Sequence, residues 1–219
     1  MSEREKPAHR ILPDTEATRE HARRIVEAGG VVAFRTDTFY GLGADPFNPT
    51  GVSRINRLKE REGRKPVLVV ISDSEVAERF MAEKAALFDE LTNHYWPGAL
   101  TVIVKARSSV PDGITAGSGT IGLRLPGDED VRAFIRTCGG ALTATSANLA
   151  GEPPARTAAE VAHYFPTELD LIIDAGDART DKPSTVIDAS PPHPRLIREG
   201  EIPRQDLERT LSALGVELK

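Results

Sequence analysis

The chain has 219 residues, of which 39% are hydrophobic and 28% charged, and its net charge is −5. These values are ordinary for one globular domain. The single cysteine, Cys138, excludes an internal disulfide and a cysteine-based metal cage, and the five histidines form no pair at metal-ligand spacing. No apolar run approaches the roughly 20 residues of a membrane helix, and the first residues lack the apolar core of a secretory signal. A cytoplasmic location is therefore expected.

Apolar periodicity predicts helices and strands that alternate along the chain. Residues 1–13 are expected to form a flexible arm, and residues 14–219 a single domain. Helices are predicted at about 14–28, 50–61, 74–93, 128–138, 157–164 and 203–214. Strands are predicted at 31–34, 67–71, 100–104, 120–125, 141–145, 169–176 and 184–188. This alternation predicts an α/β or α+β fold, with a mixed or largely parallel sheet flanked by helices.

Two polar segments directly follow predicted strands. Thr-Asp-Thr at 36–38 comes after the strand at 31–34, and Ser-Ala-Asn at 146–148 comes after the strand at 141–145. Open α/β sheets bind ligands beyond the carboxyl ends of their strands, so both segments are candidates for the wall of a pocket. A polar turn with local hydroxyl hydrogen bonds is the alternative explanation for each.

A dense group of cations follows in an otherwise acidic chain. Its members lie within residues 54–65 and are Arg54, Arg57, Lys59, Arg61, Arg64 and Lys65. Such a concentration costs self-repulsion, which an anionic ligand such as phosphate would relieve. The alternative is a solvated helix face on which these cations pair with Glu60 and Glu62.

Arg124 lies inside the apolar strand predicted at 120–125. A cation in such a strand is costly unless a carboxylate is paired with it. The sequence leaves two kinds of partner open, namely a bound ligand and a protein group such as Asp174 or Asp188.

Seven motifs occur in a fixed order: TDTFYGLGAD, KxR with a further cation four residues on, YWPGALT, TIGLRLP, TSANLAGEP, STVID and LIREG. Together they resemble the YrdC-like family of threonylcarbamoyl-AMP synthases over about residues 31–200. The resemblance implies an α/β domain with a twisted mixed sheet and a large, positively charged cavity. It also implies a nucleotidyltransferase that makes threonylcarbamoyl-AMP from L-threonine, bicarbonate and ATP and releases pyrophosphate. Mg²⁺ would accompany ATP without a metal site of its own.

The same resemblance implies roles for particular residues. Lys59 and Arg61, of the KxR motif, would be the catalytic cations. The ATP-binding residues would be Arg61, Lys65, Thr120, Ala144, Ser146, Asn148 and Arg198. The threonine-binding residues would be Thr38, Arg124 and Ser184. A separate transferase complex would then pass the threonylcarbamoyl group to adenosine 37 of tRNA, and direct tRNA contact is a further expectation.

The chain departs from the family pattern at Arg35, Val70, Thr145, Pro154 and Pro183. The family usually has proline, histidine, proline, serine and glutamate there. Of these departures, Val70 and Pro183 keep open a paralogue that acts on a different amine or acyl donor. An accessory protein that binds RNA, including double-stranded RNA, through the same basic cavity is another alternative. The acidic net charge and the aromatic content of 5% argue against that reading.

Overall fold

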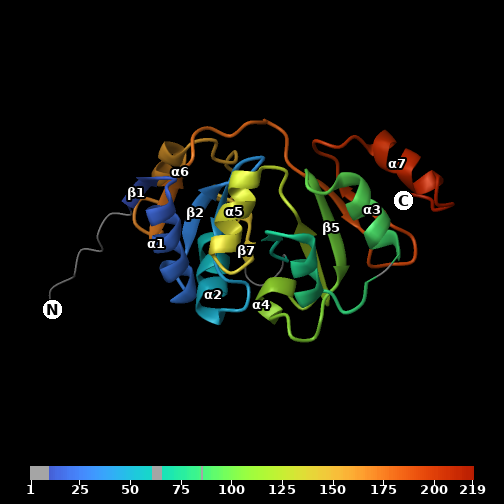
Figure 1. Ribbon diagram of the computed structural model, residues 1–219, viewed down its shortest axis with the longest axis horizontal. Coiled ribbons are helices and arrows are strands. Elements are labelled where there is room, and N and C mark those ends of the chain that lie inside the picture. The colour runs from blue at the N-terminus through green and yellow to red at the C-terminus, as the bar shows by residue number, and fades with distance from the viewer. Residues whose placement is uncertain (1–9, 61–65, 85) are drawn as a thin grey trace.

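The computed structural model describes residues 10–60, 66–84 and 86–219. In this part of the chain the strands form two mixed sheets with helices around them (Figure 1). The five-stranded sheet has the order β1 (Arg10–Pro13), β9 (Leu171–Asp174), β2 (Val32–Arg35), β3 (Tyr40–Gly43), β8 (Thr145–Ser146). The six-stranded sheet has the order β11 (Arg195–Arg198), β10 (Thr185–Asp188), β5 (Leu100–Lys105), β6 (Thr120–Arg124), β4 (Val69–Ile71), β7 (Ala141–Thr143). The predicted α/β class is confirmed, but the strands divide between two sheets instead of forming one.

Helices cover both faces of the five-stranded sheet. On one face, α1 (Glu16–Glu27) and α5 (Glu129–Thr137) lie side by side and bury a small core with β2 and β9 (Figure 1). On the other face, α2 (Pro49–Leu58) and α6 (Ala158–Tyr164) pack against β2 and β3. None of the helices in the described residues is both long and apolar enough to cross a membrane.

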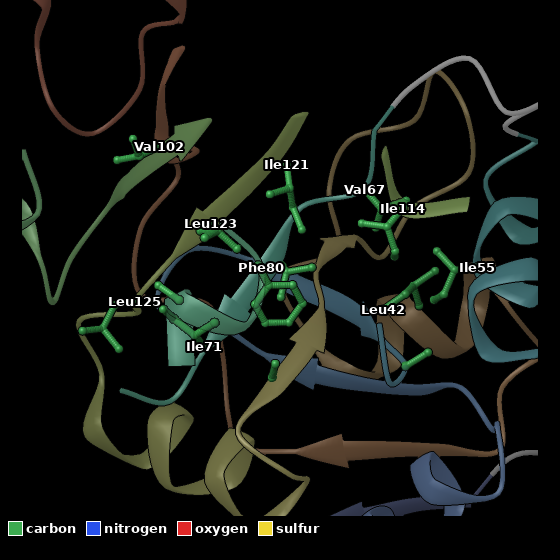
Figure 2. Close-up of a cluster of buried hydrophobic side chains, with 14 of the residues drawn as sticks. Leu42, Ile55, Val67, Ile71, Phe80, Val102, Ile114, Ile121, Leu123 and Leu125 are labelled. Atoms are coloured by element: carbon green, nitrogen blue, oxygen red, sulfur yellow. The ribbon is translucent and has the colours of Figure 1, made fainter. Parts of the chain in front are cut away.

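Strand alternation gives the six-stranded sheet one core face and one open face, because successive side chains of a strand point in opposite directions. The core face carries Leu100, Val102, Val104, Ile121, Leu123, Val69 and Ile71. Figure 2 shows part of this cluster around the buried ring of Phe80. A 3-10 helix (Ser74–Arg79), α3 (Ala86–Tyr95), α4 (Asp112–Thr115) and α7 (Arg204–Ser212) contribute side chains to the same core. The opposite face remains available for a ligand.

Helix α2 shows how local sequence places a functional side chain. The Asn48 side chain accepts hydrogen bonds from the first amides of the helix, and Pro49 occupies its first turn, both common features of a helix start. Val52 and Ile55 bury the apolar face. The helix ends at Leu58, so Lys59 follows as the C-cap residue and is held at a fixed position.

The prediction of one continuous helix over residues 74–93 is wrong. The chain instead forms the 3-10 helix, turns at Phe80 and resumes as α3. At the turn Phe80 is fully buried and its ring stacks on Phe47, with centroids 5.1 Å apart. The Ala82 amide then donates to the Lys105 carbonyl at the end of β5. Burial of Phe80 and pairing with β5 therefore outweigh the helical pattern of this segment.

Two further predictions, the flexible arm at 1–13 and the single strand at 141–145, also differ from the structure. Residues 10–13 belong to β1, which pairs in parallel with β9, and are not part of a flexible arm; residues 1–9 lie outside the described part of the chain. The strand predicted at 141–145 is divided between the two sheets. Strand β7 pairs with β4, strand β8 pairs with β3, and the Ala144 amide between them donates to the Leu68 carbonyl. The chain thus crosses from one sheet to the other within a single residue.

Candidate functional site

A cavity of about 350 Å³ lies on the open face of the six-stranded sheet. Its floor consists of alternate residues from four neighbouring strands or their ends: Leu68, Val70, Thr101, Ile103, Gly122, Arg124, Ser184 and Val186. Its walls come from the β2–β3 turn, from residues 144–146, from Pro154 and from Arg198. Segments that are far apart in the sequence therefore meet around one space.

The β2–β3 turn carries Thr38 into this wall. Thr36 closes the turn, because its amide and its hydroxyl both donate to the Phe39 carbonyl, at 3.0 and 2.7 Å. The Thr36 hydroxyl also accepts from the Thr38 amide at 3.1 Å. Both explanations of this segment hold: its hydroxyls stabilise the turn, and the turn presents Thr38 to the cavity.

Arg124 is buried on the floor, and its protein partner is Asp37. Arg124 Nη2 lies 2.6 Å from Asp37 Oδ1 as an ion pair, at an angle that does not make a hydrogen bond. Its Nε donates to the Gly98 carbonyl at 3.2 Å, and its Nη1 lies 3.3 Å from the Thr38 hydroxyl. Hydrogen-bonding capacity therefore remains on a buried guanidinium at the cavity, where an oxygen of a ligand would satisfy it.

The sequence suggested Asp174 or Asp188 as the protein partner of Arg124, and both suggestions are wrong. Asp188 pairs with Arg195 at 2.7 Å, and Asp174 accepts from the Gly176 amide. Asp37 also accepts from the Gly127 amide at 2.9 Å, so it joins the β2–β3 turn to the chain that follows β6. In the sequence, the signal that could have identified Asp37 as the partner was its position between Thr36 and Thr38 in the TDTFYGLGAD motif.

Arg198 forms a second cationic wall. Its Nε and Nη2 donate to the Ser184 carbonyl at 3.1 and 2.9 Å, and Nη2 also donates to the Ser184 hydroxyl at 3.1 Å. Burial, with a further contribution from Arg124, lowers the pKa of Arg198 from its ordinary value. Among the described residues no carboxylate forms an ion pair with Arg198, and no Asp, Glu or His lines the cavity. The cavity therefore favours anions.

Thr101 is a cavity residue that the sequence did not single out. It lies on β5 within an apolar run, and its hydroxyl is 3.0 Å from the Ser184 hydroxyl. It is the last residue of the YWPGALT motif, but a threonine inside a strand is common for its β-branched shape alone, so no role was assigned to it.

Lys59 reaches the back of the cavity wall. Its Nζ donates to the Ser146 carbonyl at 2.9 Å and to Asn148 Oδ1 at 2.8 Å. Asn148 Oδ1 also accepts from the Ser146 hydroxyl at 2.6 Å. Of these three residues, Ser146 lines the cavity, whereas Lys59 and Asn148 hold the loop that presents it.

The other residues expected to bind a ligand do not all lie at the cavity. Ala144 lines the cavity, but Thr120 lies at the start of β6, outside the lining, and pairs with the Ser118 hydroxyl at 2.9 Å. Arg61 and Lys65 fall outside the described residues. Arg54 forms an ion pair with Asp170 at 2.6 Å and so has a structural contact of its own. The cation group is therefore not a single anion site.

Four of the five departures from the family pattern line the cavity: Val70, Thr145, Pro154 and Pro183. The fifth, Arg35, is buried elsewhere, and its guanidinium lies 3.1 Å from the Asp128 carboxylate. The Arg179 guanidinium lies 3.0 Å from the same carboxylate. Burial acts to raise the pKa of Asp128, but Arg35, the Asp130 amide and Arg179 together outweigh it, so the pKa is lowered. These departures alter both the cavity surface and a buried ion-pair cluster.

Tyr40 fastens the connection between β9 and β10. Its hydroxyl donates to the Gly176 carbonyl at 2.8 Å and accepts from the Ala175 amide at 3.3 Å, and burial raises its pKa to about 12. Replacing Tyr40 with Phe is expected to lower the free energy of unfolding by about 1 kcal/mol, because two backbone groups lose a partner. Urea unfolding would measure this, and an unchanged midpoint would contradict the anchoring role.

The described residues provide no protein cage for Mg²⁺. They contain no group of three His, Cys, Asp or Glu side chains able to hold a metal ion. In this part of the chain the donor set therefore does not fit a resident metal.

The fold and the cavity define an α/β protein in which two arginines, Arg124 and Arg198, line one cavity between strands and loops. Residues 24–200 match the family model Sua5_yciO_yrdC, described as "Telomere recombination". The chain belongs to this family, which confirms the resemblance seen in the motifs.

Curated relatives named threonylcarbamoyl-AMP synthase include those of Pyrococcus abyssi and Idiomarina loihiensis. The first is 33% identical over 195 residues, which cover 89% of this chain and 57% of that protein. The second is 35% identical over 160 residues, which cover 72% of this chain and 86% of that protein. The chain thus spans little more than half of the Pyrococcus protein.

Two solved structures show the same fold. P. abyssi Sua5 complexed with L-threonine gives a TM-score of 0.88 at 31% identity, over 95% of this chain and 61% of that one. E. coli YciO gives a TM-score of 0.77 at 28% identity, over 87% of this chain and 94% of that one.

Proposed function

We propose that this chain synthesises threonylcarbamoyl-AMP from L-threonine, bicarbonate and ATP, with release of pyrophosphate. The observation that carries the proposal is a convergence of residues from separate family motifs on one cavity, whose lining contains no carboxylate among the described residues. These residues are Thr38, Arg124, Ser146, Ser184 and Arg198. Relatives that carry the synthase name support it. The complex of P. abyssi Sua5 with L-threonine supports an amino-acid substrate of this kind.

The chemistry requires little covalent participation by the protein. The amine of threonine and bicarbonate give a carbamate with loss of water, and a carbamate oxygen then attacks the α-phosphorus of ATP while pyrophosphate leaves. The two reactants are anions, so the site must neutralise and position them. Arg124, held by Asp37, suits the carboxylate of threonine, and Arg198 suits the phosphates. Arg61 and Lys65 keep the phosphate roles implied by their motif.

The product would pass to a separate transferase complex that modifies tRNA in the cytoplasm. Direct contact with tRNA stays a prediction. The first experiment is pyrophosphate release by the purified protein, with threonine or bicarbonate omitted in turn. Dependence on both substrates supports the synthase, and ATP binding without turnover, or tRNA binding alone, contradicts it.

Arg198 provides a matched test within one strand. An Arg198→Gln variant is expected to lose about 2–4 kcal/mol of transition-state stabilisation, or roughly 30- to 1,000-fold in kcat/KM, because a contact to the phosphates disappears. Arg195→Gln makes the same change in charge on the same strand, on an exposed side chain outside the cavity lining. Equal kinetics for the two variants would remove Arg198 from the proposed site.

A second candidate function is the same reaction with a different amine. It is favoured by Val70 and Pro183 in the cavity lining, where the family usually has histidine and glutamate. Assays with L-valine, L-serine and L-threonine in parallel would separate the two. Faster turnover with L-valine or L-serine than with L-threonine would identify a different amino-acid substrate. The class of reaction would remain the same.

A further inference from the structure

Three acceptors of one loop converge on the ammonium group of Lys59. They are the Ser146 carbonyl at 2.9 Å, the Asn148 carbonyl at 2.5 Å and Asn148 Oδ1 at 2.8 Å. An ammonium group has three hydrogens, so the loop offers one acceptor for each of them. A phosphate oxygen would therefore gain a hydrogen of Lys59 only by taking the place of one of these acceptors.

The side chain of Asn148 is also used fully within the loop. Its Oδ1 accepts from Lys59 and from the Ser146 hydroxyl, and its Nδ2 donates to the carbonyls of Leu149 and Glu152. These partners fix which side of the amide is the oxygen, because an ammonium only donates and a carbonyl only accepts. Asn148 is 8% exposed and, like Lys59, lies outside the cavity lining.

Lys59 also determines where the backbone carbonyls of the loop point. A carbonyl oxygen carries partial negative charge and would repel an anion if it faced the cavity. The Ser146 and Asn148 carbonyls point instead to Lys59, while Ser146 stays in the lining. Between them, the Ala147 amide donates to the Tyr40 carbonyl at 2.9 Å. The loop is therefore fixed to β3 by its backbone and to the end of α2 by Lys59.

We infer that Lys59 is a positioning residue, which joins the end of α2 to the Ser146–Asn148 loop and so fixes Ser146 in the cavity wall without contacting the phosphates. We call Lys59, Ser146 and Asn148, with the hydrogen bonds that join them, the Lys59 clip. Its geometry assigns Lys59 a different role from the catalytic cation that the motif suggested, and makes Asn148 a support for the loop instead of an ATP ligand.

This inference rests on the proposed function and deepens it, because it divides two motifs of the same site into supporting and contacting residues. Lys59 and Asn148 support the wall. Arg61 and Ser146 are left to contact the nucleotide. The clip is complete without a ligand, so the wall is formed before ATP arrives and ATP need not order it, which favours tighter binding.

The first kinetic test is Lys59→Met, which removes the ammonium and keeps an unbranched side chain. We expect KM for ATP to rise about tenfold and kcat to fall less than about threefold, because preorganisation is lost but no transition-state contact. Loss of a cation that holds the phosphates in the transition state would instead lower kcat about 100-fold or more. A fall of that size, or an unchanged KM, overturns the inference. The control Lys105→Met changes an exposed lysine outside the lining and should alter neither constant.

The second kinetic test, Lys59→Arg, separates charge from geometry. Arginine keeps the positive charge but presents its hydrogens in a planar fork, which cannot converge on three acceptors around one point. The clip therefore predicts a raised KM for ATP in Lys59→Arg, whereas simple charge neutralisation predicts wild-type kinetics. In an Asn148→Ala background, Lys59→Met should raise KM by less than it does alone, because both changes break the same clip. Wild-type kinetics in Lys59→Arg, or fully multiplicative effects in the double variant, contradict the inference.

Hydrogen–deuterium exchange of the ligand-free protein tests the clip independently of activity. We expect the backbone amides of residues 146–152 to exchange about tenfold faster in Lys59→Met than in the wild type, and at the wild-type rate in Lys105→Met. Unchanged exchange in Lys59→Met overturns the inference even if the protein is a synthase. If wild-type pyrophosphate release fails while the exchange result agrees, the proposed function fails and the role of Lys59 in fixing the loop stands.

Discussion

An Arg124→Gln variant is expected to lose threonine-dependent pyrophosphate release by about two to three orders of magnitude in kcat/KM. The reason is that a buried guanidinium with free hydrogen-bonding capacity faces the cavity, and losing such a charged contact typically costs about 2–5 kcal/mol. The variant also leaves Asp37 without its cation. Steady-state kinetics and thermal unfolding of the same preparation measure the two effects.

A double variant separates ligand binding from structural support. Arg124→Gln combined with Asp37→Asn removes both charges, so no unpaired carboxylate remains beside the cavity. We expect the double variant to regain thermal stability relative to Arg124→Gln but not activity. Recovery of activity together with stability would mean that Arg124 only supports the structure.

The largest expected loss of stability follows from Asp128→Ala. Removing this carboxylate leaves the buried Arg35 without its carboxylate partner and removes the cap at the start of α5, where Asp128 accepts from the Asp130 amide. Breaking a buried ion pair on one side costs about 3–5 kcal/mol. Urea unfolding at pH 7 measures the change.

The same variant carries a pH signature. The pKa of Asp128 is lowered in the folded protein, so its contribution is present above the ordinary aspartate value of about 4 and disappears as the pH falls toward the lowered pKa. The difference in unfolding free energy between wild type and Asp128→Ala should therefore shrink below about pH 4. Asp73→Asn is the matched control, because Asp73 pairs with Arg136 on the surface and should change stability by less than about 1 kcal/mol. A pH-independent difference for Asp128→Ala would contradict the ion-pair explanation.

Local sequence predicted the helices and strands whose apolar pattern agrees with their burial. Helix α1 is an example, because Thr15 caps it and Ala22 and Val26 form its buried face. Strand β3 was missed because its sequence, Tyr-Gly-Leu-Gly, has two glycines and no apolar run. It is a strand because it pairs with β2 and β8, and such pairings are tertiary.

Residues from the motifs line the cavity, but the sequence did not show that Thr101 of YWPGALT is among them. Thr38, Arg124, Ser184 and Arg198 came from the motifs and line one cavity. The need of Arg124 for a carboxylate could be stated from the sequence, since a cation in an apolar strand requires one. Its identity as Asp37 could not, because the contact joins the turn after β2 in one sheet to β6 in the other.

The crossing of the chain at Ala144 has a mechanical consequence for the cavity. Along β7 and β8 the two sheets are joined by a single residue, whose amide also bonds to Leu68. The connection from β9 to β10, residues 175–184, is much longer and brings Pro183 and Ser184 to the cavity. The short connection brings Ala144 and Ser146 to the cavity, and the long one brings Pro183 and Ser184 to it from the other side of the chain. A ligand that contacts both sheets would therefore join them again, across the cavity, in addition to the covalent crossing at Ala144.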